Sequence, residues 1–540
     1  MRIPTNVFLR YNISMLSNNQ ITYHNNSTGQ LVLPVNTKTL IHHNDPVFTF
    51  NEVVERINLN KYISKSHLGR DGYNSTSLLK IILFSFMINV RSTRKIADLC
   101  ANDIRLMWLS NNIRPSHNTI SRFIKHNISN CIEDIFVEVN NYFIMKDDIN
   151  TDVLYVDGTK FEANANRYSF VWKKATLKFQ AKLYLKISNI FKLLNNVLPQ
   201  YDIHTNIETK ESYQLNDVLY VLDILESIID KFGLVLIYGK GKRKLNIQKY
   251  YDSLIEYKDK LVDYDNKLKI CGNHRNSYSK TDNDATFMRM KDDYMRNGQL
   301  KAGYNIQIGV SDEYILNVEV YQDRSDVKTF QSFLNDYKDK YGFMPKYPVG
   351  DAGYGSYDNY LFCKENNLEL YQKYVMYSKE KERSFKKKIF NSRNFEYFGF
   401  RNVKCPMGKE FIYEYSNINE SGQYDRIIDH YKCHDCHECI YQSECTKSSD
   451  GYRGLQVCDK LRKLEREAKR NLDSELGIEL RVNRSSQVEG AFGVIKEDMK
   501  YRRISRKGIE NVRVEFKLIC LGYNLMKYHN KKYRKTKILN

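Results

Sequence analysis

Two aspartates in this sequence each follow a short apolar run that favours a β-strand. Asp157 follows residues 153–156 and precedes a glycine, and Asp351 follows residues 347–350. We expect both strands to end at these positions, because an apolar run that stops at Asp-Gly is typical of a buried strand meeting a turn. A carboxylate held by a strand end suits a metal ligand, although Asp-Gly is also an ordinary turn pair.

The order of the predicted elements indicates how these two aspartates meet. A helical stretch follows the first strand, and an antiparallel pair, a helix, the second Asp-ended strand, another helix and another strand come next. These elements are predicted at 164–296, 302–310 with 314–320, 327–341, 347–351, 356–366 and 368–375. The order is that of an α/β, RNase H-like mixed sheet with insertions, which brings the ends of its first and fourth strands together. Paired carboxylates at such a seam require a divalent cation between them.

A third carboxylate is expected from a late helix. Glu489 and Lys496 are seven residues apart, so one α-helix would place them on one face about 10 Å apart along its axis. The carboxylate would hold metal while the ammonium meets a phosphate, and Val488, Phe492 and Ile495 would pack the helix onto the sheet. Two metal ions held in this way activate water and stabilise a leaving oxygen during attack on a phosphodiester.

The chain resembles bacterial insertion-sequence DDE transposases of the eleven-eighty-two group. The resemblance rests on motifs that begin at Val156, Lys280, Gly303, Gly350 and Val488, among them Val156-Asp-Gly-Thr-Lys-Phe-Glu162, Gly303-Tyr-Asn-Ile-Gln307 and Val488-Glu-Gly-Ala-Phe-Gly493. It implies an RNase H-like catalytic core, an all-α N-terminal DNA-binding domain, and Asp157, Asp351 and Glu489 as ligands of Mg²⁺ or Mn²⁺. It also implies a homodimer or larger assembly on DNA, since two transposon ends must be joined.

One position departs from related groups, which carry an arginine one helical turn before the glutamate. Here that position is Ser485, and Arg484 stands five residues before Glu489, where an α-helix would turn it to a different face. We therefore take Arg502 and Arg503 as the candidates for phosphate contacts beside Lys496.

Five cysteines lie between residues 405 and 445, and their Cys-x-x-Cys spacing favours a metal site over disulfides. By the resemblance, the set that binds a structural Zn²⁺ is Cys405, Cys436, Cys439 and Cys445. Cys433 is then spare, and iron or no metal is the alternative.

Composition and charge point to a polyanion partner. The chain has 540 residues with 84 Lys and Arg against 64 Asp and Glu, a formal charge of +20. Residues 481–540 carry 16 basic and five acidic residues, so they hold 11 of the 20 excess charges. Nucleic acid is favoured over an anionic membrane. No apolar run reaches the roughly 20 residues of a membrane span, and no secretory signal is present, so a bacterial cytoplasmic, nucleoid-associated location is expected.

The N-terminal part favours helices. Residues 115–125 predict a capped, short basic helix presenting Arg122 and Lys125 to DNA in a helix-turn-helix arrangement, with an ordinary helical bundle as the alternative. The predicted division is an N-terminal lead, a helical DNA-binding domain, a catalytic core with a helical and a Cys-rich insertion, and a basic tail. Their bounds are 1–45, 46–150, 151–530 with insertions 171–296 and 378–454, and 531–540.

These observations predict a DNA transposase that binds terminal inverted repeats and cuts and joins DNA strands. Two alternatives from other classes stay open: a catalytically inactive DNA-binding derivative, and a metal-dependent nuclease that does not join strands.

Overall fold

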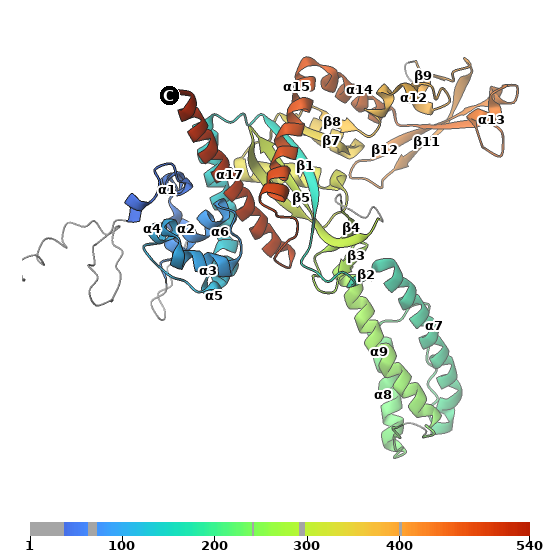
Figure 1. Ribbon diagram of the computed structural model, residues 1–540. Coiled ribbons are helices and arrows are strands. Elements are labelled where there is room, and N and C mark those ends of the chain that lie inside the picture. The colour runs from blue at the N-terminus through green and yellow to red at the C-terminus, as the bar shows by residue number, and fades with distance from the viewer. Residues whose placement is uncertain (1–36, 63–72, 240–241, 291–297, 399–401, 540) are drawn as a thin grey trace, which may run out of the picture.

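The computed structural model describes residues 37–62, 73–239, 242–290, 298–398 and 402–539. Most of the predicted N-terminal lead therefore lies outside the described residues. The protein is a mixed α/β molecule in which a central sheet is flanked by N-terminal helices, a long helical arm and a strand-rich unit (Figure 1).

The central sheet has the strand order β4-β5-β1-β7-β8, with β6 also pairing with β5. Its long strands β1, β5 and β6 are antiparallel to their neighbours in that set, while β1, β7 and β8 run parallel. The bounds are β1 Val153–Glu162, β4 Thr286–Arg289, β5 Leu300–Ser311, β6 Tyr314–Tyr321, β7 Tyr347–Gly355 and β8 Tyr371–Tyr374. The predicted antiparallel pair is confirmed, and its turn uses Asp312 and Glu313 with φ of 46° and 71°.

The prediction that the first strand ends at Asp157 is wrong. Strand β1 continues to Glu162, because Asp157 to Glu162 pair with β5 from Ile308 to Gly303. What ends near Asp157 is the parallel pairing with β7, whose last pair is Tyr155 with Val349. The apolar run corresponds to the part of β1 that lies between β5 and β7. The polar part, from Asp157 to Glu162, pairs with β5 and no longer with β7.

Six N-terminal helices lie beside the sheet. They are α1 Pro46–Arg56, α2 Ser75–Met87, α3 Thr93–Asn102, α4 Ile104–Ser110, α5 His117–Phe123 and α6 Ser129–Asp147. Ser116 caps α5 by accepting a hydrogen bond from the Thr119 backbone N–H at 3.2 Å, as predicted. The predicted short basic helix does not stop there, because the π-turn Ile124–Ile128 joins α5 to α6.

Helix α17, Ile509–Leu539, joins the N-terminal helices to the sheet (Figure 1). Phe84 of α2, Tyr304 of β5 and Phe516 of α17 belong to one hydrophobic core. Gly522 permits the close approach, since a Cβ there would lie 2.6 Å from the Phe86 carbonyl oxygen. Helix α17 continues into the predicted basic tail at 531–540, where Lys532 forms an ion pair with Glu52 at 2.5 Å.

The helical insertion forms an arm that projects from the sheet (Figure 1). Its α-helices are α7 Lys173–Val197, α8 Leu215–Lys231 and α9 Asn246–Cys271. Their apolar faces make a core separate from that of the sheet. Strands β2 Phe170–Trp172 and β3 Ser277–Ser279 pair at its base.

The Cys-rich insertion is a five-stranded antiparallel sheet with its own small core. Its elements are α12 Arg383–Lys386, β9 Glu396–Tyr397, β10 Val403–Lys404, β11 Glu410–Asn419, β12 Arg426–Cys433, α13 Gln442–Cys445 and β13 Arg453–Val457.

Two further helices pack near the central sheet, α10 Phe330–Tyr341 and α11 Tyr357–Glu365.

The late helical segment returns from this unit to β1. Helix α14, Asp459–Asp473, packs against β8, and α15, Glu475–Arg484, leads into a segment with two wide turns. That segment comprises the π-turn η11 Ser485–Glu489, α16 Gly490–Gly493 and the π-turn η12 Val494–Asp498. Val488, Phe492 and Ile495 are buried, which confirms the predicted packing of this segment.

Candidate active site

The parallel pairing of β1 with β7 brings Asp157 and Asp351 to neighbouring positions. Each aspartate stands two residues beyond the last paired residues, Tyr155 and Val349. Asp351 begins the irregular part of β7, where the register with β8 shifts between Gly350 and Gly355, and its Oδ1 accepts a hydrogen bond from the Gly353 backbone N–H at 2.7 Å. The two strands therefore place two carboxylates at one edge of the sheet.

A guanidinium group lies between these carboxylates. Arg484 Nη1 is 4.0 Å from Asp157 Oδ2, and Arg484 Nη2 is 3.9 Å from Asp351 Oδ2. The Arg484 side chain is only 12% exposed, and its buried Nη1 atom has no hydrogen-bond partner. Two carboxylates that face one cation offset the repulsion that they would otherwise exert on each other.

The prediction for Arg484 placed it on a different face of an α-helix from Glu489. It assumed a regular α-helix, whereas Arg484 is followed directly by the π-turn η11. A π-turn closes through hydrogen bonds between residues five apart, so it reduces the angle between side chains at that spacing. Arg484 thus reaches the two aspartates although it stands five residues before Glu489.

Glu489 ends the same π-turn and is exposed. Its Oε2 accepts a hydrogen bond from Ser485 Oγ at 2.9 Å. Over the described residues, no three His, Cys, Asp or Glu side chains stand close enough together to hold one metal ion in their present positions. The structure thus brings Asp157 and Asp351 together around Arg484, and it leaves Glu489 on the adjoining helical segment.

Side chains of the late segment meet β1 in a row. Asn483 forms a side-chain hydrogen bond with Tyr155, Arg484 faces Asp157, and Lys496 Nζ donates to Thr159 Oγ1 at 2.8 Å. Since alternate residues of a strand point to one face, this row fixes which face of β1 the late segment covers. Lys496 consequently lies on the same face as Asp157.

The two arginines predicted to contact phosphates have other partners. Arg502 forms an ion pair with Glu497 at 2.5 Å on the exposed surface. Arg503 donates to the backbone carbonyls of Ala163 and Ala165 at 3.3 and 3.1 Å and lies 3.8 Å from Glu162. Glu162 also pairs with Lys301 at 2.9 Å. Arg503 therefore tethers the chain after the late segment to the end of β1.

Asp326 is a further carboxylate at this edge that the sequence did not single out. It begins the short turn η7, Asp326–Lys328, and its Oδ1 accepts hydrogen bonds from Asn305 Nδ2 at 2.7 Å and Gln307 Nε2 at 2.8 Å. A Cβ built at Gly353 would lie 2.9 Å from Asp351 Oδ1 and 3.8 Å from Asp326 Oδ2, so the two carboxylates are neighbours. An aspartate just before a helix resembles a cap in sequence, which hides this role.

Position 158, directly after Asp157, has no room for a side chain larger than that of glycine. A Cβ at Gly158 would lie 2.0 Å from Gln307 Nε2 and 2.7 Å from Asp326 Oδ1. Gln307 also accepts a hydrogen bond from the Tyr354 hydroxyl. Complete burial, reinforced by the carboxylates of Asp326, Asp157 and Asp351, raises the pKa of Tyr354 well above its usual value, so this hydroxyl remains a donor.

The motif around Asp282 and Asp284 supports α17 instead of the aspartate pair. Asp282 Oδ1 accepts from the Tyr304 hydroxyl at 2.9 Å and from the Gly508 backbone N–H at 3.1 Å, and Asp284 Oδ2 accepts from the Ile509 N–H at 2.9 Å. Carboxylates satisfy free N–H groups at a helix start and interact well with its dipole.

Arg122 and Lys125 are exposed on α5 and the π-turn that follows it. Helix α5 packs against α3, and Ile120 and Phe123 are buried beneath it. The surface that carries these two basic residues is thus directed to solvent.

All five cysteines of the insertion line one cavity of about 20 Å³. Cys433, which the resemblance leaves spare, is among them and is 1% exposed. Burial and a hydrogen bond with Cys436 raise the pKa of Cys433 to about 12. Cys405, Cys436, Cys439 and Cys445 thus line one cavity together with Cys433, but over the described residues no three of these thiols stand close enough, as placed, to hold one metal ion.

Comparison with known families agrees with this arrangement. Residues 404–529 match the family model described as a transposase DDE domain, and residues 35–126 match the transposase domain DUF772. The chain therefore contains two regions similar to transposase domains, one of them of the DDE type. No curated protein and no solved structure matches it.

The two matches contain different predicted functional residues. The DDE match contains Glu489 and Lys496 and most of the Cys-rich insertion, and the N-terminal match contains Arg122 and Lys125. Asp157 and Asp351 lie outside both matched ranges. None of the helices over the described residues is long and apolar enough to cross a membrane.

Proposed function

We propose that the protein is a DNA transposase that binds the terminal inverted repeats of an insertion sequence and catalyses metal-dependent strand cleavage and strand transfer. The observation that carries the proposal is the meeting of Asp157 and Asp351 around Arg484 at 4.0 and 3.9 Å, beside the segment that bears Glu489 and Lys496. The matched transposase domains are the second support.

An RNase H-like core is part of this proposal. Support comes from the strand order β6-β5-β1-β7-β8, with antiparallel neighbours up to β1 and parallel neighbours after it. In such a sheet the first and fourth long strands are adjacent, which accounts for two carboxylates 194 positions apart in sequence sharing one edge.

The donor set fits a divalent cation. Oxygen ligands suit Mg²⁺ and Mn²⁺, and the guanidinium group between Asp157 and Asp351 indicates that the space between them favours positive charge. Asp157, Asp351 and Glu489 are the residues proposed to hold the metal. When bound, it supplies activation of a water or 3′ hydroxyl and stabilisation of the leaving oxygen.

The protein's own groups position the DNA for this chemistry. Lys496, held by Thr159 on the Asp157 face of β1, is placed to neutralise a phosphate next to the scissile bond. The hydrogen-bonded network of buried Gln307 and Tyr354 with half-buried Asp326 holds Gly158 and the Asp351 loop in place, so the two aspartates keep a fixed separation.

Replacing Asp157, Asp351 or Glu489 with Ala should abolish cleavage of a labelled element end in Mg²⁺, because each change removes a carboxylate proposed to hold metal. Binding to the same end in EDTA should persist. Asp339→Ala removes an exposed carboxylate of α10 and is the matched control, which should cleave normally. Retained strand transfer in all three variants would refute the assignment.

The same assay separates the alternatives. Joined product with the wild-type protein supports a transposase, cleavage without joining indicates a nuclease, and binding alone indicates an inactive derivative.

Arg122 and Lys125 are proposed to contact the repeat, and a homodimer or larger complex on DNA is proposed because two ends must be brought together. The activity would take place on nucleoid DNA in a bacterial cytoplasm.

The Cys-rich insertion is proposed to bind one structural Zn²⁺ through Cys405, Cys436, Cys439 and Cys445. Support comes from the single small cavity that these thiols line. Thiolates filling a tetrahedron leave no position for water, so this metal would stabilise the insertion and take no part in catalysis. Elemental analysis of the purified protein should find one zinc per chain, and Cys436→Ser with Cys439→Ser should lose it. Wild-type protein without zinc would contradict the site.

A further inference from the structure

Helix α14 carries an exposed basic face whose charges are not neutralised within the described protein. Its buried side chains, Leu464, Ala468 and Leu472, recur every four residues. The opposite side presents four exposed cations: Lys463, Arg466, Lys469 and Arg470. Across the described residues, none of these four forms an ion pair with a carboxylate.

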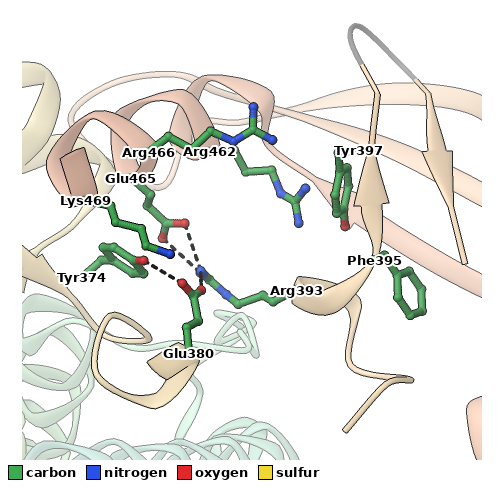
Figure 2. A pocket seen from close by; sticks show the side chains of 9 residues that line it. All are labelled: Tyr374, Glu380, Arg393, Phe395, Tyr397, Arg462, Glu465, Arg466 and Lys469. Atoms are coloured by element: carbon green, nitrogen blue, oxygen red, sulfur yellow. Dashed lines mark hydrogen bonds and ion pairs between the residues drawn. The ribbon is translucent and has the colours of Figure 1, made fainter. Parts of the chain in front are cut away.

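Three of the four acidic residues of the same helix form ion pairs with basic residues outside it. Glu465 pairs with Arg393 at 3.0 Å, Glu467 pairs with Lys364, and Asp473 pairs with Lys381 at 2.8 Å. Figure 2 shows Arg393 reaching between Glu380 and Glu465, with which it forms ion pairs. Neighbouring residues therefore neutralise the carboxylates of Glu465, Glu467 and Asp473, while Lys463, Arg466, Lys469 and Arg470 are left available to a partner.

The surface at this face is hollowed. Lys463, Arg466, Lys469 and Arg470 line an open hollow of about 780 Å³ together with Asp473 and Ser474. A neighbouring cavity of about 250 Å³ lies between α14 and the Cys-rich insertion (Figure 2). Its wall includes Arg462, whose guanidinium lies 3.2 Å from the centre of the Tyr397 ring, together with Arg466 and Lys469.

Basic residues continue from this face to the candidate active site. Asp473, at the end of α14, accepts hydrogen bonds from Tyr377 and Lys381 at 2.6 and 2.8 Å, and Arg481 lies 5.6 Å from the Tyr377 ring. Lys373 is the next basic residue toward Asp351. Burial and the nearby guanidinium groups of Arg484 and Arg481 lower the pKa of Lys373, while the Asp351 carboxylate opposes that shift. The series Lys381, Arg481 and Lys373 thus links α14 to Asp351.

We propose that Lys463, Arg466, Lys469 and Arg470 form a DNA-backbone site that holds the duplex flanking the cleavage point. This inference rests on the proposed function, and it adds a second DNA-contacting surface to the N-terminal helices. Lys463 and Arg470 are seven residues apart, about 10 Å along the helix, which matches roughly three nucleotides of one strand. Flexible basic side chains that no neighbouring residue holds in place can contact phosphates, but such contacts do not recognise a base sequence.

The test uses the full chain in EDTA and two duplexes, one ending at the element end and one extending into flanking DNA. Wild-type protein should bind the extended duplex more tightly and with a steeper salt dependence. The variant Lys463→Gln/Arg466→Gln/Lys469→Gln/Arg470→Gln should bind the extended duplex at least about tenfold more weakly. Its log–log salt slope should fall by about 3, since each phosphate contact contributes about 0.9.

The matched control keeps every charge: Lys463→Arg/Arg466→Lys/Lys469→Arg/Arg470→Lys should retain the wild-type slope. Thermal melting of both variants checks folding, and the buried face of α14 is unchanged in each. If wild-type protein neither binds nor cleaves element ends, the proposed function fails. If it does both, and the glutamine variant keeps the wild-type slope on the extended duplex, the α14 site is overturned.

Discussion

Arg484 neutralises the two aspartates on which the proposed chemistry depends. Without metal, Arg484→Ala removes the guanidinium that lies 4.0 and 3.9 Å from Asp157 and Asp351. We expect the free energy of unfolding to fall by about 1–3 kcal/mol. Saturating Mn²⁺ should raise the Tm of the variant more than that of the wild type, because the ion no longer competes with a guanidinium. Differential scanning fluorimetry with and without Mn²⁺ measures both.

Two variants control for this effect. Arg484→Lys keeps a positive charge and should restore most of the metal-free stability. Arg167→Ala removes an exposed arginine from a loop and should change neither Tm. An Arg484→Ala protein as stable as wild type in EDTA would show that this cation does not balance the aspartate pair.

At this scale the sequence predicted the residues on strands better than those on loops and wide turns. Asp157 and Asp351 were selected as candidate ligands because each follows a run of apolar residues, which predicts a buried strand. Asp326 was missed because its carboxylate reaches the site from a turn, through Asn305 and Gln307 on another strand. No local pattern encodes that contact.

At the scale of elements, periodicity predicted most helices and strands, and the differences lie where tertiary contacts extend or widen an element. Strand β1 continues six residues past Val156, to Glu162, because β5 supplies hydrogen-bond partners along its polar part. The π-turns Ile124–Ile128, Ser485–Glu489 and Val494–Asp498 interrupt segments whose sequence looks like ordinary α-helix. A π-turn changes the angle between the side chains on either side of it, and no local pattern predicted that Arg484 lies beside Asp157 and Asp351.

Helix α17 illustrates a second limit at this scale. Its apolar pattern predicts a buried helix, but the sequence does not say that two different layers bury it. The buried Asn524 accepts from the Ile315 backbone N–H of β6 at 2.9 Å and donates to Asn140 of α6 at 2.8 Å. Because one helix bonds to both, the N-terminal helices and the sheet are held in a fixed relation.

At the scale of the whole molecule, the arm differs from the rest because its core is separate. The apolar side chains of α7, α8 and α9 pack on one another, while the N-terminal helices, the sheet and α17 share one core. At the base, the Lys173 backbone N–H donates to the Asn276 carbonyl at 2.9 Å, next to the β2 and β3 pair. The chain thus enters and leaves the arm at adjacent points.

This geometry predicts that the arm can be removed without unfolding the sheet. Replacing residues 174–273 with Asn-Gly leaves a four-residue loop, Asn-Gly-His274-Arg275, between Lys173 and Asn276, a length that joins antiparallel strands well. The shortened protein should stay soluble, melt cooperatively within a few degrees of wild type, and keep Mg²⁺-dependent cleavage of a single element end. Asp157→Ala in the same shortened chain should remove that cleavage. Aggregation, or loss of the cooperative transition, would mean that the arm supports the central core despite packing apart from it.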